Sequence, residues 1–344
     1  MPRPQPNPQK EARFQYLLTI GIVAMEGRGF EYPIDCLPAT SDLIFVTNKS
    51  RNEGQRGVRV SMLNLDSEYF GEFGLFGEED GSLVSPSGIA EDENGHVLVL
   101  DEILNRLTIY NQDGTYIKKW EPFSSQGQEL NGPSAIAVAS NGNVFVSDTG
   151  NHRVVVFNEV GKIVSSIGHL GADDGEFQYP WGITFDNFDN LYVADWGNNR
   201  IQMFSSAGAF VRSFEGTTSN NYELNHPSSV VIDLIGNLII ADWGNESVKI
   251  VTPDSTLVQE LRGEATLSRW AQEFMDSNLE ESDARKGADL DNPPIKGTDD
   301  EQHTISAHVE KYFWAPTSVK LDSNRRLYVT DSNRHRIQIY RLEE

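Results

Sequence analysis

The feature that most constrains this chain is a short apolar run ending in Asp, which recurs at a fixed spacing. The runs are VLVLD, VFVSD, LYVAD, LIIAD and LYVTD, and they end at Asp101, Asp148, Asp195, Asp242 and Asp331. Successive Asp residues lie 47 residues apart, except that the last interval is longer. Self-similarity at such a period indicates a repeat architecture, so the fold must be built from copies of one small unit.

A proline marks the start of each copy, fifteen residues before the Asp. These prolines are Pro86, Pro133, Pro180, Pro227 and Pro316. A sixth, degenerate copy precedes them, with Pro33 at its start and Asn48 in place of the Asp. Each copy holds four short apolar strands separated by Gly, Asn and Asp, the residues that turns favour. Four strands per copy predict the blade of a β-propeller, and six copies predict six blades.

The two ends of the sequence predict how the ring closes. The last copy stops after a third strand, RIQIYRLEE, whereas the chain begins with RFQYLLTIG, which matches fourth strands such as AFVRSFEG (209–216). We therefore predict an all-β, six-bladed propeller of four-stranded blades, closed by the N-terminal strand. Such closure removes the open edge that an unclosed array would expose. The propeller is expected to span residues 14–344, after a flexible Pro-rich tail at 1–13.

The most regular copies, such as GNVFVSDTGNHRVVVF (142–157), resemble the NHL repeat, a family named for an Asn-His element of this kind. The segment GADDGEFQYPWGITFD (171–186) is similar to the family's lead-in to a blade. The resemblance covers residues 14–344 apart from one insertion, and it implies a six-bladed propeller. It does not imply one function, because relatives include protein- and RNA-binding modules, amidating lyases and lactonase-like hydrolases.

Charge and composition exclude two classes of partner. The net charge of −23 repels phosphate backbones, so nucleic acid is not an expected partner. No apolar run is long enough to span a membrane. The apolar segment LLTIGIVAM has no cationic leader and no cleavage-like site, and we interpret it as a strand rather than a signal peptide. With Cys36 as the single cysteine, a cytoplasmic location is expected.

In most copies an Arg follows the Asp five residues later. The pairs are Asp101/Arg106, Asp148/Arg153, Asp195/Arg200 and Asp331/Arg336. Four identical copies indicate a structural role, in which the Arg reaches back to the Asp and holds the loop between the second and third strands. In one copy Ser247 stands where the partner of Asp242 should be, and in another Asn48 stands where the partner of Arg59 should be. Asp242 and Arg59 thereby become candidate site residues, although both charges could simply be solvated.

Tryptophans gather in the loops of one propeller face, where the loops between second and third strands meet those that lead into first strands. They are Trp181, Trp196, Trp243 and Trp314, with Trp120 ending a fourth strand on the same side. The indoles could pack between blades, or they could form a stacking surface for a sugar, a cation or a peptide. The candidate ligand-binding residues are Arg59, Trp181, Trp196, Trp243 and Trp314. The basic loop KSRNEGQR (49–56) could hold an anion or be merely solvated.

Residues 262–313 interrupt the repeat between blades five and six. Their apolar residues follow helical spacing at Leu267, Trp270, Ala271, Phe274 and Met275. This spacing predicts a helix with one apolar stripe, capped by Thr266 or Ser268. A long ordered insertion over a binding face is typical of a lid, and a disordered surface loop is the alternative. As a lid, it would bring His303 and His308 over Asp242, His226 and Arg59.

Candidate catalytic and metal-binding residues are few and scattered. His226 precedes Pro227 on the candidate face and His308 lies in the insertion; with Asp242 they are the candidate catalytic residues. Amidating lyases of this fold hold zinc with several His near the blade prolines, but the residues that follow the prolines here are Ser87, Ser134, Trp181, Ser228 and Thr317. Lactonase-like relatives hold calcium with carboxylates and Asn at the channel mouth, for which Asp35 and Asp242 are the candidates.

Function is expected where the copies differ, because identical positions in every blade serve the scaffold. The tryptophans favour a binding module or scaffold that recognises a small molecule, a glycan or a protein on the Trp-rich face. The alternative is a metal-dependent hydrolase or lyase, with calcium or zinc at the mouth of the central channel and the insertion at 262–313 as its lid.

Overall fold

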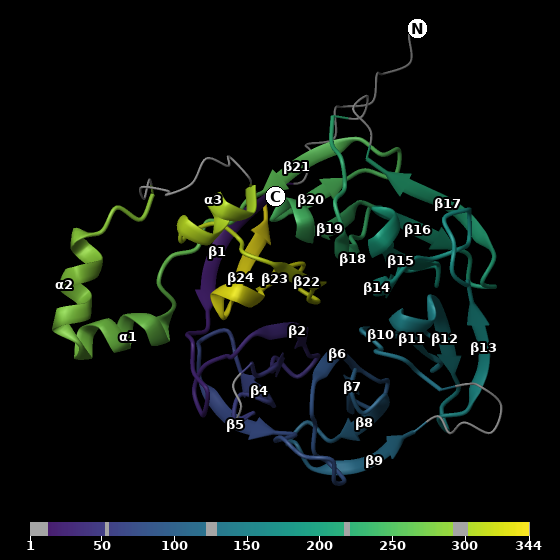
Figure 1. The fold of residues 1–344 in the computed structure, drawn as a ribbon, viewed down its shortest axis with the longest axis horizontal. Coiled ribbons are helices and arrows are strands. Elements are labelled where there is room, and N and C mark those ends of the chain that lie inside the picture. The colour runs from purple at the N-terminus through teal and green to yellow at the C-terminus, as the bar shows by residue number, and fades with distance from the viewer. Residues whose placement is uncertain (1–12, 52–54, 122–128, 217–220, 292–301, 344) are drawn as a thin grey trace, which may run out of the picture.

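The computed structural model describes residues 13–51, 55–121, 129–216, 221–291 and 302–343. Its strands form six four-stranded antiparallel sheets arranged as a ring (Figure 1). The innermost strands begin at or just after the blade prolines, as predicted: β2 (Pro33–Pro38), β6 (Pro86–Glu91), β10 (Ala135–Val138), β14 (Pro180–Phe185), β18 (Pro227–Ile232) and β22 (Pro316–Leu321). Each begins a blade, and the blades are numbered one to six in this order.

The second strands end at the repeat Asp or its replacement: β3 (Ile44–Asn48), β7 (Val97–Asp101), β11 (Val144–Asp148), β15 (Leu191–Asp195), β19 (Leu238–Asp242) and β23 (Leu327–Asp331). The third strand of blade one is β4 (Arg59–Leu63). In blades two to six the third strand begins five residues after the Asp: β8 (Arg106–Tyr110), β12 (Arg153–Phe157), β16 (Arg200–Phe204), β20 (Ser247–Val251) and β24 (Arg336–Leu342). The outermost strands are β5 (Tyr69–Phe73), β9 (Tyr116–Trp120), β13 (Ile163–Ile167), β17 (Phe210–Glu215), β21 (Leu257–Leu261) and β1 (Phe14–Ile20).

The ring closes as the two chain ends predict. β1 pairs antiparallel with β24, from Phe14 opposite Leu342 to Ile20 opposite Ile337. The innermost strands contact one another around the ring, including β2 of blade one with β22 of blade six. The six-bladed fold and its closure by the N-terminal strand are therefore confirmed.

The hydrophobic core lies between the blades rather than at the centre of the ring. One cluster, for example, joins Leu98 and Leu100 of blade two to Val144 and Val146 of blade three. Neighbouring blades cover both faces of each sheet, so the second and third strands read as almost continuous apolar runs instead of alternating. That is why every copy shows runs such as VLVLD.

A single 3-10 turn joins the second and third strands in blades three to six: η1 (Thr149–Asn151), η2 (Trp196–Asn198), η4 (Trp243–Asn245) and η5 (Ser332–Arg334). The next residue has left-handed backbone, with φ of 51° to 55° at His152, Asn199, Glu246 and His335. Its side chain accepts a hydrogen bond from the backbone N–H that precedes the next blade's proline: His152 from Tyr179, Asn199 from His226, Glu246 from Ala315 and His335 from Tyr32. The Asn-His element of the repeat therefore joins each of these blades to the next.

The insertion contains three helices within the described residues: α1 (Arg269–Ser277), α2 (Leu279–Gly287) and α3 (Gln302–His308). Ser268 caps α1, as one of the two predicted caps, by accepting a hydrogen bond from the Ala271 N–H at 3.1 Å. Residues 292–301, also part of the predicted insertion, lie outside the described residues. In the part of the chain that the structure describes, no helix has the length and apolarity to cross a membrane.

The predicted lid is wrong for α1 and α2, because both lie outside the ring, α1 beside β1 and α2 against α1 (Figure 1). The Trp270 ring is buried against Phe30 and Tyr69, and its Nε1 donates to the Ser67 carbonyl at 2.7 Å. Trp270 thus packs at the outer edge between blades six and one, which buries its indole fully, whereas Phe274 of the predicted stripe is 45% exposed. The helix α3 contacts the loop face, where it lies against η4.

Candidate functional site

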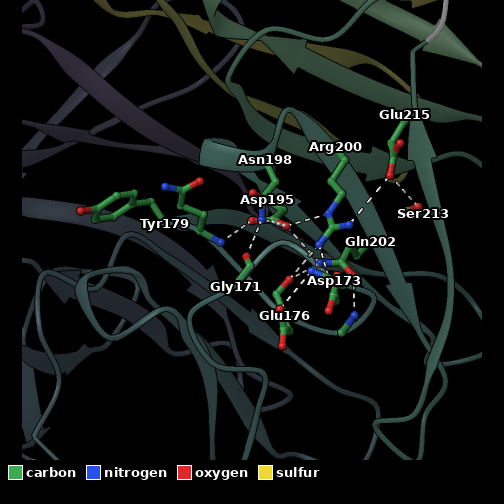
Figure 2. Close-up of polar contacts among 12 residues, drawn as sticks. Gly171, Asp173, Glu176, Tyr179, Asp195, Asn198, Arg200, Gln202, Ser213 and Glu215 are labelled. Carbon is green, nitrogen blue, oxygen red and sulfur yellow. Dashed lines mark hydrogen bonds and ion pairs between the residues drawn. The ribbon is translucent and has the colours of Figure 1, made fainter.

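The repeat Asp and Arg residues form a buried scaffold network. Three predicted pairs are present, with N–O distances of 2.8 to 2.9 Å: Arg153 with Asp148, Arg200 with Asp195 and Arg336 with Asp331. Figure 2 shows the network in blade four, where Asp195 also accepts from Asn198 and Gln202 and Arg200 also donates to the backbone carbonyls of Asp173 and Glu176. Burial raises the pKa of the Asp195 carboxyl, against the opposing effect of its hydrogen bonds and of Arg200.

In blade two, the expected Asp101–Arg106 pair is replaced by separate contacts. The Asp101 carboxylate accepts from the backbone N–H groups of Val84 and Ser85 at 2.6 and 2.9 Å. Arg106 donates to the carbonyls of Glu78, Glu79 and Ser82 in the loop that leads into blade two. The common task of the repeat Arg is therefore to hold the lead-in loop of its own blade, and pairing with the Asp is secondary.

Arg59 performs that same task, so the expectation that it is free for a ligand is wrong. Its side chain is fully buried and donates to the carbonyls of Ala24, Met25 and Gly29 in the loop leading into blade one. It also pairs with Glu72, with an N–O distance of 3.1 Å. Burial lowers the pKa of the Arg59 guanidinium, and the neighbouring carboxylates oppose that shift.

Asp242 is not free either, because Lys249 replaces the missing Arg. Lys249 Nζ contacts the Asp242 carboxylate, which also accepts from the Asn225 N–H and from Asn245 Nδ2, both at 2.7 Å. Lys249 lies two residues beyond Ser247 on β20, so both side chains point to the same side of the strand. Burial raises the pKa of the Asp242 carboxyl and Lys249 opposes it. This arrangement makes Asp242 part of the scaffold.

The remaining candidate catalytic and metal-binding residues do not converge. His308 lies on α3 with its Nδ1 against the Thr304 carbonyl, whereas His226 lies before blade five. Asp35 is buried on β2, where it accepts from the Ile89 N–H and pairs with Lys320 at 3.3 Å. Among the described residues, no three His, Cys, Asp or Glu side chains form a group suited to a metal ion. Burial raises the pKa of the Cys36 thiol to about 12, which makes it a poor nucleophile.

Three of the predicted tryptophans form a continuous row, which we call the indole arc: Trp181, Trp196 and Trp243. The ring centroid of Trp196 lies 6.2 Å from that of Trp181 and 6.2 Å from that of Trp243, with interplanar angles of 53° and 52°. All three rings are half-buried. Asp195 lies opposite Pro180 at the start of the innermost strand β14, so Trp196, which follows it, stands at the rim of the central channel.

His226 belongs to the same aromatic surface. Its ring centroid lies 4.1 Å from that of Trp196 and 6.5 Å from that of Trp243. The His226 backbone has φ of 53°, a strained conformation for a non-glycine residue. Asn199 holds it there by accepting from the His226 N–H at 2.8 Å. The geometry thus supports a stacking role for His226 beside the arc.

The other two tryptophans lie apart from the arc. Trp120 is almost fully buried and stacks on Phe157, so its expected place on the open face is wrong. Trp314 contacts the insertion: its Nε1 lies 3.3 Å from His303 Nε2, and His303 Nδ1 contacts the buried Glu246 carboxylate. Burial raises the pKa of the Glu246 carboxyl, against the opposing effects of Ala315 and His303. Trp314 therefore helps to anchor α3 to blade five.

The rim of the channel has a charged side and an aromatic side. The first residues after the repeat Asp or its replacement include Lys49 and Glu102, which pair at 2.7 Å, and Trp196 and Trp243 of the arc. The basic loop is engaged on the charged side: Lys49 pairs with Glu102, and the Arg51 guanidinium lies 4.0 Å from the Tyr32 ring centroid. Comparing the residues that directly follow each repeat Asp would have found this division, which the sequence analysis missed.

These features define the class of protein as a six-bladed β-propeller whose loop face is asymmetric. The NHL repeat matches this sequence at residues 130–157, 177–204 and 313–340, in blades three, four and six. The protein is an NHL-repeat six-bladed β-propeller, as the sequence resemblance indicated.

Similar solved structures share the fold at low identity. One is an inactive variant of virginiamycin B lyase from Staphylococcus aureus with quinupristin (16% identity, 92% of this chain and 82% of that chain, TM-score 0.55). A putative gluconolactonase matches at 14% identity, with 98% and 95% covered and a TM-score of 0.58. A chain of a nidogen/laminin complex matches at 21%, with 67% and 79% covered and a TM-score of 0.51. A comparison with curated proteins gave no match. At these identities the likeness concerns the fold alone.

Proposed function

We propose that this propeller is a binding module, whose ligand contacts the indole arc at the rim of the channel. The arc itself is the observation that supports the proposal. Three half-buried indoles in adjacent blades offer a large, rigid apolar surface that costs little conformational entropy to use. The matching positions in the other blades hold Lys, Glu, Thr and Ser after the repeat Asp, so the scaffold does not require Trp there.

The alternative is a metal-dependent hydrolase or lyase with its site in the same mouth. Two of the structural neighbours are a lyase and a putative gluconolactonase, which motivates testing it. The candidate residues His226, Asp242 and His308 lack a shared geometry, and Asp242 is occupied by Lys249. This distribution favours the binding module.

One pair of measurements separates the two functions. Binding would be screened against glycan, peptide and small-molecule panels with the full chain and with Trp196→Ala, and calcium and zinc content would be measured on purified protein. A ligand whose affinity falls at least tenfold in the variant supports the binding module. Stoichiometric calcium or zinc together with turnover of a lactone or of quinupristin would overturn it in favour of the enzyme.

A further inference from the structure

The charge around the indole arc is one-sided. The described loops that surround the arc are residues 168–179, 196–199, 221–226 and 243–246, and they contain no Lys or Arg. Their acidic residues are Asp173, Asp174, Glu176, Glu223 and Glu246. Of these, Asp173, Asp174 and Glu223 are exposed. A ligand on the arc therefore meets carboxylates and no competing cation from these loops.

Other aromatic rings on the same face already have a cation of the protein beside them. The Arg51 guanidinium lies over Tyr32, and that of Arg334 lies 5.5 Å from the Trp314 ring centroid. Among the described residues, no Lys or Arg lies over Trp181, Trp196 or Trp243. The indole faces attract cations electrostatically, so the arc offers sites for a cation of a ligand beside the His226 ring, which packs against Trp196.

The spacing of the arc matches an extended polypeptide. Neighbouring indole centroids are 6.2 Å apart. An extended chain rises about 3.3 Å per residue, so side chains at alternate positions lie on one side, about 6.6 Å apart. Successive alternate side chains of such a segment can therefore reach successive indoles.

We propose, resting on the binding function above, that the arc binds an extended basic segment of a partner protein, with Arg or Lys at alternate positions. Each cation would stack on one indole, while the exposed carboxylates of the lead-in loops attract the segment. The chain's net charge of −23 would accelerate the encounter through long-range attraction. A neutral glycan could donate hydrogen bonds to these carboxylates but would gain no long-range attraction from them.

The test uses three labelled peptides of one length at physiological salt, two of which have the same composition. One peptide alternates three Arg with Ser, a second places the three Arg consecutively, and a third has Glu in place of Arg. Fluorescence anisotropy with the full chain should show the alternating peptide binding severalfold more tightly than the consecutive one, and the Glu peptide not binding. Equal affinity for the two Arg peptides would overturn the proposal, since that equality is what non-specific charge attraction alone predicts.

The matched variants are Trp196→Ala in the arc and Phe188→Ala on the turn between β14 and β15. Phe188 is the more exposed ring, at 81%, and belongs to the same blade, but its turn lies at the other end of β14 from Trp181. Trp196→Ala should weaken the alternating peptide by about tenfold, whereas Phe188→Ala should leave it unchanged. If Trp196→Ala fails to fold, the double variant Asp173→Asn, Asp174→Asn serves instead and should weaken binding severalfold.

The outcome also separates this inference from the binding function itself. If both sets of substitutions leave the affinity for the basic peptides unchanged while the affinity for a glycan or small molecule depends on Trp196, the proposal of a cationic ligand is wrong and the proposed binding module is supported. If the affinity for no ligand of any class depends on Trp196, both the binding function and the basic ligand are contradicted.

Discussion

At the scale of single residues, the repeat Arg is the most informative side chain in this protein. Arg200 is nearly buried, pairs with Asp195 and holds two carbonyls of its lead-in loop (Figure 2). Removing one partner of a buried pair leaves the other charge uncompensated. The same reasoning explains why Arg59 stays buried without an Asp partner: the carbonyls and Glu72 satisfy it.

Arg200→Ala should therefore lower the free energy of unfolding by about 3 kcal/mol. Arg341→Ala is the control, because Arg341 is exposed near the end of the third strand β24. That control should cost no more than about 0.5 kcal/mol. Urea denaturation of both variants measures the difference, and equal costs would contradict a special role for the repeat Arg.

His335 predicts a specific pH dependence of stability. Its Nδ1 accepts from the Tyr32 N–H at 3.0 Å, and burial, aided by Arg51, lowers the pKa of the ring to about 4 from an ordinary 6.5. The unfolded chain therefore takes up this proton first as the pH falls. The contribution of His335 to stability is complete above about pH 6.5 and is lost as the pH falls towards 4.

His335→Asn should remove that dependence, because Asn199 fills the same position in blade four and makes the same hydrogen bond. Between pH 6.5 and 4 the variant should lose about 1–2 kcal/mol less unfolding free energy than the original protein. Unfolding curves at several pH values measure this. Parallel pH profiles would show that the ring does not titrate in this way.

At this scale, the sequence predicted contacts that follow from the spacing of residues along neighbouring strands. It did not predict contacts that depend on how far a long side chain reaches. Three Asp–Arg pairs were predictable because neighbouring strands fix their register. Lys249 was overlooked because it lies seven residues after Asp242 rather than five, although the second position along the strand faces the same way. Gln202 reaches Asp195 from the same position in blade four, a precedent that only the structure reveals.

At the scale of elements, the insertion separates what a sequence can predict from what it cannot. The helical spacing predicted α1, and the sequence offered Thr266 or Ser268 as its cap, of which the structure uses Ser268; both are local properties. The docking of the helix was not predictable. An apolar stripe shows that a surface covers it, but several surfaces could, and the outer edge between blades six and one offered the deepest burial for Trp270.

Trp270→Ala should therefore destabilise the whole protein by about 3–5 kcal/mol, through the lost contacts with Phe30 and Tyr69 and the cavity left behind. Phe274→Ala on the same helix is the matched control, because Phe274 is 45% exposed. Its cost should stay near about 0.5 kcal/mol. Thermal melting compares the stability of the two variants. A mild effect of Trp270→Ala would show that the docking of α1 contributes little to the stability of the propeller.

At the scale of the whole molecule, stability depends on the ring being closed by two distant parts of the chain. β1 supplies the outermost strand of blade six, and Phe14 joins the core cluster between blades five and six. In the other five blades the outermost strand follows the third strand through a short turn. The closure can therefore be tested without changing any contact, by moving β1 along the chain.

A variant lacking residues 13–21 should lose cooperative unfolding, because β24 would have an open edge and Phe14 would be missing from the core. A circular permutant that begins at Ile22 and carries residues 13–21 after Glu344, joined by a short turn, should melt close to the original protein. Antiparallel pairing from Phe14 opposite Leu342 is compatible with such a turn. Differential scanning calorimetry compares the three proteins. A deletion variant as stable as the permutant would show that the five remaining complete blades hold the ring without β1.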